Sequence, residues 1–284
     1  MRTVCGRQPA LYLAANFCGT IWKHWVTTVS EVISLLSRMA QSTSVDAVWQ
    51  IAANHFASCG FSRVNYGYTR FRVDWHLGDP DDAIFLTTTS PDYVKVYFNE
   101  GFYARTPMYR WVMENTGACT WEWVEKAFHD GLLPEDEANA VARNMRMGIH
   151  AGVSISFPET SLRDKGALGL IADPRLGHAE VAQIWATRGE EIMAVAGMMH
   201  LKVTQLPMAT RRRPLTARQR EALEWVADGK TMQDIALLMD ISAAMVEKHL
   251  RLAREALNVD TTAQAVAKGA LLNMIFPPAS AAAS

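Results

Sequence analysis

The sequence is poor in cysteine, and its few cysteines do not stand in pairs. The chain of 284 residues contains four, at positions 5, 18, 59 and 119, with no CxxC spacing. This scatter excludes a dense disulfide framework and a zinc site built from thiolates. His129, His150 and His178 also lack the spacing of paired metal ligands, so we expect no metal site. The cysteine usage indicates a reducing compartment, and we expect a cytoplasmic protein.

Long hydrophobic runs are also missing. No stretch of about 18 apolar residues occurs, so the sequence predicts no transmembrane helix and no membrane partner. The chain begins with two arginines and a short apolar run, which Asn16 and Gly19 interrupt and which no cleavage motif follows. We therefore expect residues 1–40 to form an N-terminal extension, partly disordered or containing a start codon assigned upstream of the true start.

The motifs of several enzyme and signalling classes are absent as well. The chain has no G-x-S-x-G elbow, no Cys-His motif and no Gly-rich loop followed by Lys-Ser or Lys-Thr. The acidic cluster DPDD at 79–82 lies in a loop broken by Pro and Gly, without an alternating βα series around it. This arrangement excludes a phosphorylated receiver domain. We expect no enzyme and no cofactor other than a small signal ligand.

What remains is an ordinary globular composition, with 49% hydrophobic and 20% charged residues and a net charge of −1. From Leu215 onward the sequence predicts four short helices. Thr216 and Gln219 form a capping box at the start of the first, and Gly229 supplies a left-handed cap at its end. Ser242 caps the third helix, which is longer and basic. Two short helices joined by a tight turn, the second longer and basic, are typical of a helix-turn-helix.

The third helix carries basic side chains outside its apolar stripe. These side chains can reach phosphates or base edges in a DNA groove. The second helix begins at Lys230-Thr231, where free backbone amides can hold a phosphate. On spacing alone, a four-helix cap with a solvated charged face remains an alternative. The residues expected to contact DNA are Lys230, Thr231, Ser242, Glu247, Lys248, Arg251 and Arg254.

The run from Leu215 to Ile275 resembles the LuxR-type helix-turn-helix over its whole length. It contains the L-T-x-R opening, L-x-x-x-A-x-G-K-T, I-A-x-x-x-x-I-S, V-x-x-H-L-x-x-A and the closing T-x-A-Q-A-V-A-K. Gln219 stands where this family nearly always has Glu, and Met245 replaces a frequent Thr. The resemblance implies a homodimer, paired through the fourth helix, on a pseudo-palindromic promoter site. RNA polymerase is a further candidate partner.

The preceding residues alternate between helical and strand-like patterns without a regular crossover repeat. The patterns predict helices over 45–59, 91–100, 107–115, 134–147 and 179–203, and strands over 61–70, 83–86, 148–157 and 166–173. This order favours an α+β fold, with an α-β-α sandwich around one antiparallel sheet, followed by the all-α four-helix domain. We expect the ligand domain over 41–203, a linker over 204–214, the helix-turn-helix over 215–276 and a disordered tail over 277–284.

Residues 93–111 concentrate seven aromatic side chains within 19 positions. This region resembles the autoinducer-binding domain of quorum-sensing LuxR regulators, whose motif is W-x3-Y-x8-D-P with a Trp 14 residues later. Tyr93 occupies the Trp position, Tyr97 the Tyr, Thr106 the Asp, and Trp121 the second Trp. The sequence GIHAG at 148–152 matches a later glycine step. The resemblance covers about residues 45–203.

In that family the Trp donates to the lactone carbonyl of an acyl-homoserine lactone, and the Asp accepts the ligand's amide N–H. The resemblance therefore implies ligand contacts for Tyr93, Tyr97, Thr106, Trp121, Thr89 and Gly152. Thr106 changes the acceptor from a carboxylate, worth roughly 1.5–3 kcal/mol, to a neutral hydroxyl, worth about 0.5–1.5 kcal/mol. Thr89 stands where the family often has a further Tyr. Aromatic residues at helical spacing are also common in cores, so simple packing remains the alternative for this segment.

The sequence thus predicts a signal-responsive, DNA-binding transcription regulator whose ligand is an acyl-homoserine lactone or a related compound. Two alternatives stay open: a ligand-independent or non-lactone regulator of the same type, and a partner without DNA binding that forms heterodimers. Arg211, Arg212 and Arg213 in the linker are interpreted either as a solvated hinge or as an arm that contacts phosphates.

Overall fold

The computed structural model of the chain describes residues 30–74, 76–208 and 210–276. Most of the predicted extension (residues 1–29) and the predicted tail (277–284) lie outside these residues. The described end of the extension, residues 30–41, forms a helix. Its Met39 side chain is fully buried in the hydrophobic core, so this helix belongs to the folded unit.

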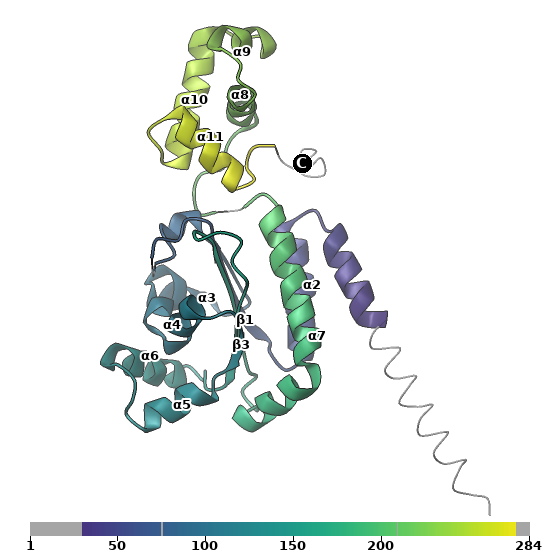
Figure 1. Cartoon of the computed structure of the whole chain (residues 1–284), viewed down its shortest axis with the longest axis vertical. Helices are drawn as coiled ribbons and strands as arrows, with labels where there is room; N and C mark the ends of the chain where they lie inside the picture. The colour runs from purple at the N-terminus through teal and green to yellow at the C-terminus, as the bar shows by residue number, and fades with distance from the viewer. Residues whose placement is uncertain (1–29, 75, 209, 277–284) are drawn as a thin grey trace, which may run out of the picture.

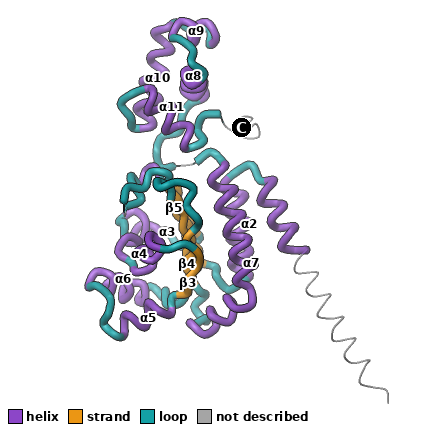
Figure 2. The backbone as a smooth tube through the Cα atoms, viewed as in Figure 1, coloured by secondary structure: helices purple, strands orange, loops and turns teal. Residues whose placement is uncertain are grey.

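The centre of the fold is a five-stranded antiparallel sheet in the order β2-β1-β5-β4-β3. Figure 2 shows these strands between two sets of helices. Most residues of β1 and β5 are buried, because helices cover both faces of the sheet. The strands are β1 (Arg63–Thr69), β2 (Ile84–Thr87), β3 (Gly117–Thr120), β4 (Gly152–Ser156) and β5 (Lys165–Ile171).

Helices cover both faces of the sheet, which confirms the predicted α+β sandwich. On one face, α2 (Val45–Ser58) lies beside the long α7 (His178–Gln205), as Figure 1 shows. The other face carries shorter helices and turns. These are α3 (Pro91–Val94), a π-helical turn (Lys95–Asn99), a 3-10 turn (Phe102–Arg105), α4 (Pro107–Glu114), α5 (Glu122–His129) and α6 (Glu135–Arg146).

Local capping explains where α3 and α4 begin. Ser90 caps α3 and Thr106 caps α4, and in both helices Pro follows at the first position. The predicted helix over 91–100 is in fact one helical turn followed by the π-helical turn. Strand β3 and helix α5 were not predicted from the sequence.

The C-terminal part contains the four helices that the sequence predicts. Three of them begin with a capping box, at Thr216, Thr231 and Thr261, and Ser242 caps the third helix alone. Gly229, with φ of +79°, forms the predicted left-handed cap. The helical spacing of Ile235, Ala236, Leu238 and Met239 predicts a buried stripe on the second of these helices, but Leu238 is 50% exposed. The helices are α8 (Ala217–Ala227), α9 (Met232–Leu238), α10 (Ala243–Leu257) and α11 (Thr262–Leu271).

Candidate ligand cavity and DNA-binding surface

A cavity of about 90 Å³ lies between the sheet and the helices α3 to α6. Its wall is mainly aromatic and aliphatic, with a few polar side chains. Such a mixture is typical of sites that bind small, largely apolar molecules. The aromatic lining residues are Tyr66, Phe85, Tyr93, Tyr97, Phe98, Tyr103, Tyr109 and Trp121.

Two of the predicted ligand residues form one wall of this cavity together. The rings of Tyr93 and Tyr97 stack with centroids 4.9 Å apart and an interplanar angle of 18°. The Asn65 amide nitrogen donates to the Tyr93 hydroxyl over 3.4 Å. Burial raises the pKa of Tyr93 above its ordinary range and raises that of Tyr97 to about 12. Both phenols therefore stay neutral at physiological pH and can serve as hydrogen-bond donors.

Trp121 also lines the cavity, and it is nearly buried. Its indole nitrogen donates to the Ser154 hydroxyl over 2.9 Å. Gly152 lies behind this ring and not in the cavity wall. A Cβ atom at Gly152 would lie 2.7 Å from the Trp121 ring and would clash with the carbonyl oxygen of Leu170. Gly152 thus allows the Trp121 ring to lie directly on strand β4.

Thr106 is fully buried but is not among the residues that line the cavity. Its hydroxyl donates to the Tyr103 carbonyl over 2.8 Å and accepts from the Tyr109 N–H over 3.2 Å, because Thr106 is the N-cap of α4. The same side chain also approaches Tyr97. Thr89 likewise lies outside the lining, and its hydroxyl is 2.7 Å from that of Thr87.

The cavity also contains polar residues that the motif comparison had not indicated. Asn65 comes from β1, Asn144 from α6 and Ser154 from β4. All three are less than 10% exposed. Asn and Ser are mostly exposed residue types, so only the tertiary structure identifies them as lining residues.

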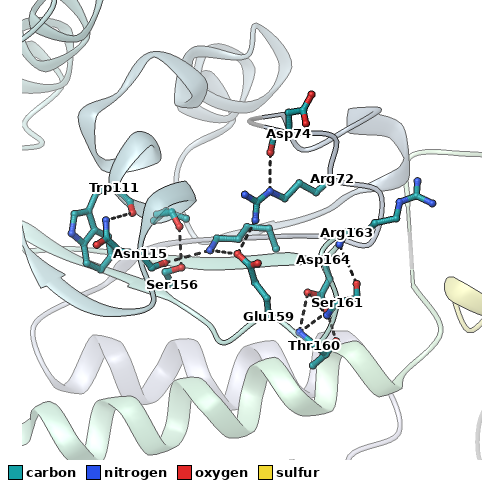
Figure 3. A network of polar contacts seen from close by, with 12 residues as sticks. Arg72, Asp74, Trp111, Asn115, Ser156, Glu159, Thr160, Ser161, Arg163 and Asp164 are labelled. Carbon is teal, nitrogen blue, oxygen red and sulfur yellow. Dashed lines mark hydrogen bonds and ion pairs between the residues drawn. The ribbon is translucent and has the colours of Figure 1, made fainter.

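Among the described residues that line the cavity, one is charged: Lys165, which is 2% exposed. Its ammonium group donates to the Glu159 carboxylate over 2.7 Å and to the Asn115 carbonyl over 3.4 Å. Arg72 binds the same carboxylate at 2.7 Å, and Figure 3 shows these partners in one network. Burial would raise the pKa of Glu159, but its hydrogen bonds and charge contacts with Lys165 and Arg72 lower it overall. The Lys165 charge is therefore neutralised, and the cavity favours an uncharged ligand.

The residues predicted to contact DNA gather at the N-terminal ends of α9 and α10 and along α10. Thr231 and Ser242 are N-caps, and each accepts a backbone N–H with its hydroxyl. Six of the seven predicted residues are exposed, and Arg254 is half-buried. Arg254 donates to Glu247 over 2.9 Å and to Thr262 over 2.8 Å, and Arg251 pairs with Glu255. In the part of the chain that the structure describes, no ion pair engages Lys248 or Lys230.

The linker arginines contact the ligand-binding part of the chain. The Arg211 guanidinium lies 5.5 Å from the centroid of the Phe85 ring and donates to Asn99 over 2.7 Å. Arg212 pairs with Asp79 and, at 2.5 Å, with Asp82. The structure thus shows Arg211 and Arg212 bound to the sandwich and not held as a free arm.

Asp82 also joins the two parts of the chain directly. Its carboxylate, 6% exposed, accepts from Lys268 of α11 over 2.7 Å in addition to its pair with Arg212. Close by, Asn273 donates to the carbonyls of Thr204 and Leu206 over 2.8 and 3.0 Å. We call the three residues Asp82, Arg212 and Lys268 the interdomain ion cluster.

A separate polar cluster lies between α2 and α7. Side-chain ligand atoms of His55, Cys59 and Glu191 lie within 4.8 Å of one another. Arg188, however, donates to both Glu191 oxygens, over 2.8 and 3.0 Å. A cation already neutralises this carboxylate, and burial, the leading influence on both groups, lowers the pKa of His55 and raises that of the Cys59 thiol. The arrangement is that of a structural ion pair.

Among the described helices, none combines the length and the apolarity needed to cross a membrane.

Comparison with known proteins gives two family matches. Residues 44–203 match the model of the autoinducer binding domain, and residues 213–268 match that of the bacterial regulatory proteins of the luxR family. The chain is 26% identical to the quorum sensing-dependent transcriptional regulator RpaR of Rhodopseudomonas palustris over 77% of this chain and 84% of that protein. It is 28% identical to the transcriptional activator SolR of Ralstonia nicotianae over 76% and 86% of the two chains.

Among solved structures, SdiA of Escherichia coli matches with 17% identity and a TM-score of 0.45, covering 88% of this chain and 99% of that one. The autoinducer-binding match alone spans more than half of the chain. The chain therefore belongs to the LuxR-type transcriptional regulators, with an autoinducer-binding domain followed by a helix-turn-helix.

Proposed function

We propose that this regulator binds an uncharged acyl-homoserine lactone, or a related compound, in the cavity and binds promoter DNA through α10. The similar proteins RpaR and SolR, named as a quorum sensing-dependent regulator and a transcriptional activator, support this assignment. The neutral phenols of Tyr93 and Tyr97 and the apolar wall suit such a ligand. Lys230, Lys248 and Arg251 supply the phosphate and base contacts.

The observation that carries the signal-responsive part of the proposal is the contact between the linker and the cavity wall. Arg211 lies over the ring of Phe85, and Phe85 lines the cavity. A cavity of about 90 Å³ is smaller than typical ligand sites, which are roughly 300–1,000 Å³. An acyl chain therefore enters by separating the aromatic walls. Movement of Phe85 shifts Arg211 and with it the start of the DNA-binding domain.

We further propose that the active form is a cytoplasmic homodimer on a pseudo-palindromic site. Leu271, at the end of α11, is an exposed apolar side chain that a second α11 can cover. Two copies of α10 then meet two half-sites, as the pairing of helix-turn-helix proteins with operators requires. RNA polymerase is the partner proposed for activation from such a site.

The test uses the purified full-length protein, N-octanoyl-homoserine lactone and a DNA pool with randomised pseudo-palindromic half-sites. We expect the lactone to raise the melting temperature and to change the recovery of bound DNA. A double variant, Lys248→Ala with Arg251→Ala, is expected to lose at least about tenfold in DNA affinity and to keep the lactone shift. The matched control is Arg218→Ala, since Arg218 is an exposed arginine on α8 that pairs with Glu221. An unchanged melting curve across a series of lactones contradicts the ligand assignment.

A non-lactone or ligand-independent regulator is the second candidate. The observation in its favour is the Thr106 hydroxyl, which the backbone of Tyr103 and Tyr109 already engages. In this case DNA is recovered equally with and without lactone. Failure of the homodimer to retain any DNA from the pool favours the third reading, a partner that acts only in heterodimers.

A further inference from the structure

Asn144 on α6 carries a buried amide that the protein itself does not satisfy. The residue is 3% exposed, and its side-chain oxygen has no hydrogen-bond partner among the described residues. Its backbone carbonyl is used by Met147 and Ile149, so the side chain plays no part in ending the helix. Buried side-chain amides are nearly always hydrogen-bonded, because an unpaired one loses its hydration without compensation. A buried amide of this kind calls for a partner.

The position of Asn144 shows where that partner would lie. Asn144 lines the main cavity and also a smaller adjoining cavity of about 20 Å³. The two cavities share Met108, Trp121 and Ile149 as well, so the amide stands at their junction. Met108 and Ile149 offer it no strong hydrogen bond, and the Trp121 indole N–H is already bound to Ser154. Glu125 and His150 also line the smaller cavity, but the Asn144 oxygen has no bond to either of them. The amide therefore faces space that a ligand can occupy.

Several other polar groups around the cavity are already engaged. The Trp121 indole donates to Ser154, and the Lys165 ammonium binds Glu159. The Asn65 amide accepts from Thr87 and donates to Tyr93. Thr106, at the position where the resemblance expects the amide acceptor, caps α4 and does not line the cavity.

We propose that Asn144 is the polar anchor for an uncharged ligand that carries an amide, as N-acyl compounds do. This inference rests on the proposed function and names the group that recognises the ligand. Whichever way round the side chain lies, a primary amide offers a donor and an acceptor. The acceptor receives the ligand's N–H, and the donor binds its carbonyl. A carboxylate ligand is disfavoured, because the Lys165 charge is neutralised by Glu159.

The test compares two probes with the full-length protein: N-octanoyl-homoserine lactone and its ester counterpart, in which an oxygen replaces the amide N–H. We expect the wild type to bind the amide about tenfold more tightly than the ester, measured by calorimetry or by quenching of tryptophan fluorescence. Asn144→Leu, which conserves volume, is expected to bind both probes equally. Asn139→Leu is the control, because Asn139 is exposed on the same helix.

Thermal stability without ligand separates anchoring from a structural role. Asn144→Leu should melt at the same temperature as the wild type or higher, because it removes an unpaired amide. A lower melting temperature, or retention of the amide preference by Asn144→Leu, overturns the inference and leaves the proposed function intact. If the wild type binds neither probe, the lactone assignment fails, and this inference fails with it.

Discussion

The polar contacts of the DNA-binding helices join residues close together in the sequence, whereas those of the ligand-binding sandwich join residues far apart in it. In α8, α9 and α11, the capping residue and its partner are three positions apart, as in Thr216 with Gln219. Around the cavity, the Trp121–Ser154 bond spans 33 positions, and the hydroxyl of Tyr66 meets His200 of α7 across 134. Local contacts can form in any one helix, whereas the cavity needs the whole sheet in register. We therefore expect the DNA-binding helices to keep their fold when the sandwich is changed. A change in these helices at their junction with the sandwich, in contrast, is expected to affect the sandwich.

The largest effect is expected at the interdomain ion cluster, where this separation breaks down. Asp82→Ala leaves Lys268 and Arg212, each 12–13% exposed, without their shared carboxylate. Breaking a buried ion pair typically costs 3–5 kcal/mol, and residual exposure here places the loss at about 3–4 kcal/mol. The free energy of unfolding of the full-length protein in urea measures it. Asp81→Ala, at the exposed neighbouring position, should change stability by less than about 0.5 kcal/mol. Equal stability of the two variants would show that the cluster does not stabilise the junction.

A slightly smaller effect is expected inside the sandwich, at Gly152. Gly152→Ala forces the Trp121 ring and the Leu170 carbonyl apart, and overpacking of this kind costs about 3 kcal/mol. Gly169→Ala on the neighbouring strand is the control, since its nearest atom would be 3.9 Å from the new Cβ. Thermal melting followed by far-UV and near-UV circular dichroism compares the two. If Gly152→Ala has the same melting temperature as the control, the Trp121 ring has room to move, and the cavity wall is less rigid than its contacts indicate.

The pH dependence of stability should also originate in the sandwich. Burial lowers the pKa of His200 to about 4; the Asp164 charge partly offsets this effect, and the Arg70 charge adds to it. The Nδ1 atom of His200 lies 2.9 Å from the Tyr66 hydroxyl. Since the unfolded value is about 6.5, the unfolded chain takes up a proton that the folded chain refuses. Stability therefore falls as the pH drops from 6.5 to 4, by roughly 2–3 kcal/mol, and then levels off. His200→Gln should flatten this part of the profile in urea unfolding. His129→Gln, at an exposed site, should leave it unchanged.

The same difference in range explains what the sequence could predict. The four C-terminal helices follow from Thr216, Ser242 and Gly229, whose effects act within one turn, and the structure confirms them. Strand β3 has the sequence GACT, without apolar alternation, and exists because it pairs with β4. No local pattern could have indicated it.

For the cavity, the sequence predicted only part of the side chains that line it. Motif spacing identified Tyr93, Tyr97 and Trp121, which do line the cavity. It also indicated Thr106, whose hydroxyl is engaged by the start of α4. Asn144 was missed because a polar residue in a charged helix is normally solvated, and only the packing of α6 over the sheet buries it.

The smallest effect, and the sharpest test of locality, is expected in the DNA-binding helices. Thr216→Ala removes the hydroxyl that accepts the Gln219 N–H, which should cost about 1 kcal/mol of stability in the helix-turn-helix. Thr216→Ser keeps the hydroxyl and should lose little. Because the capping box is confined to α8, ligand binding by the sandwich should be the same in both variants. Hydrogen exchange resolved by segment measures how far the effect of Thr216→Ala spreads. Faster exchange limited to α8 and the helices packed against it supports the difference between the DNA-binding helices and the sandwich. Equal acceleration around Trp121 would mean that the two regions unfold as one unit despite their different contacts.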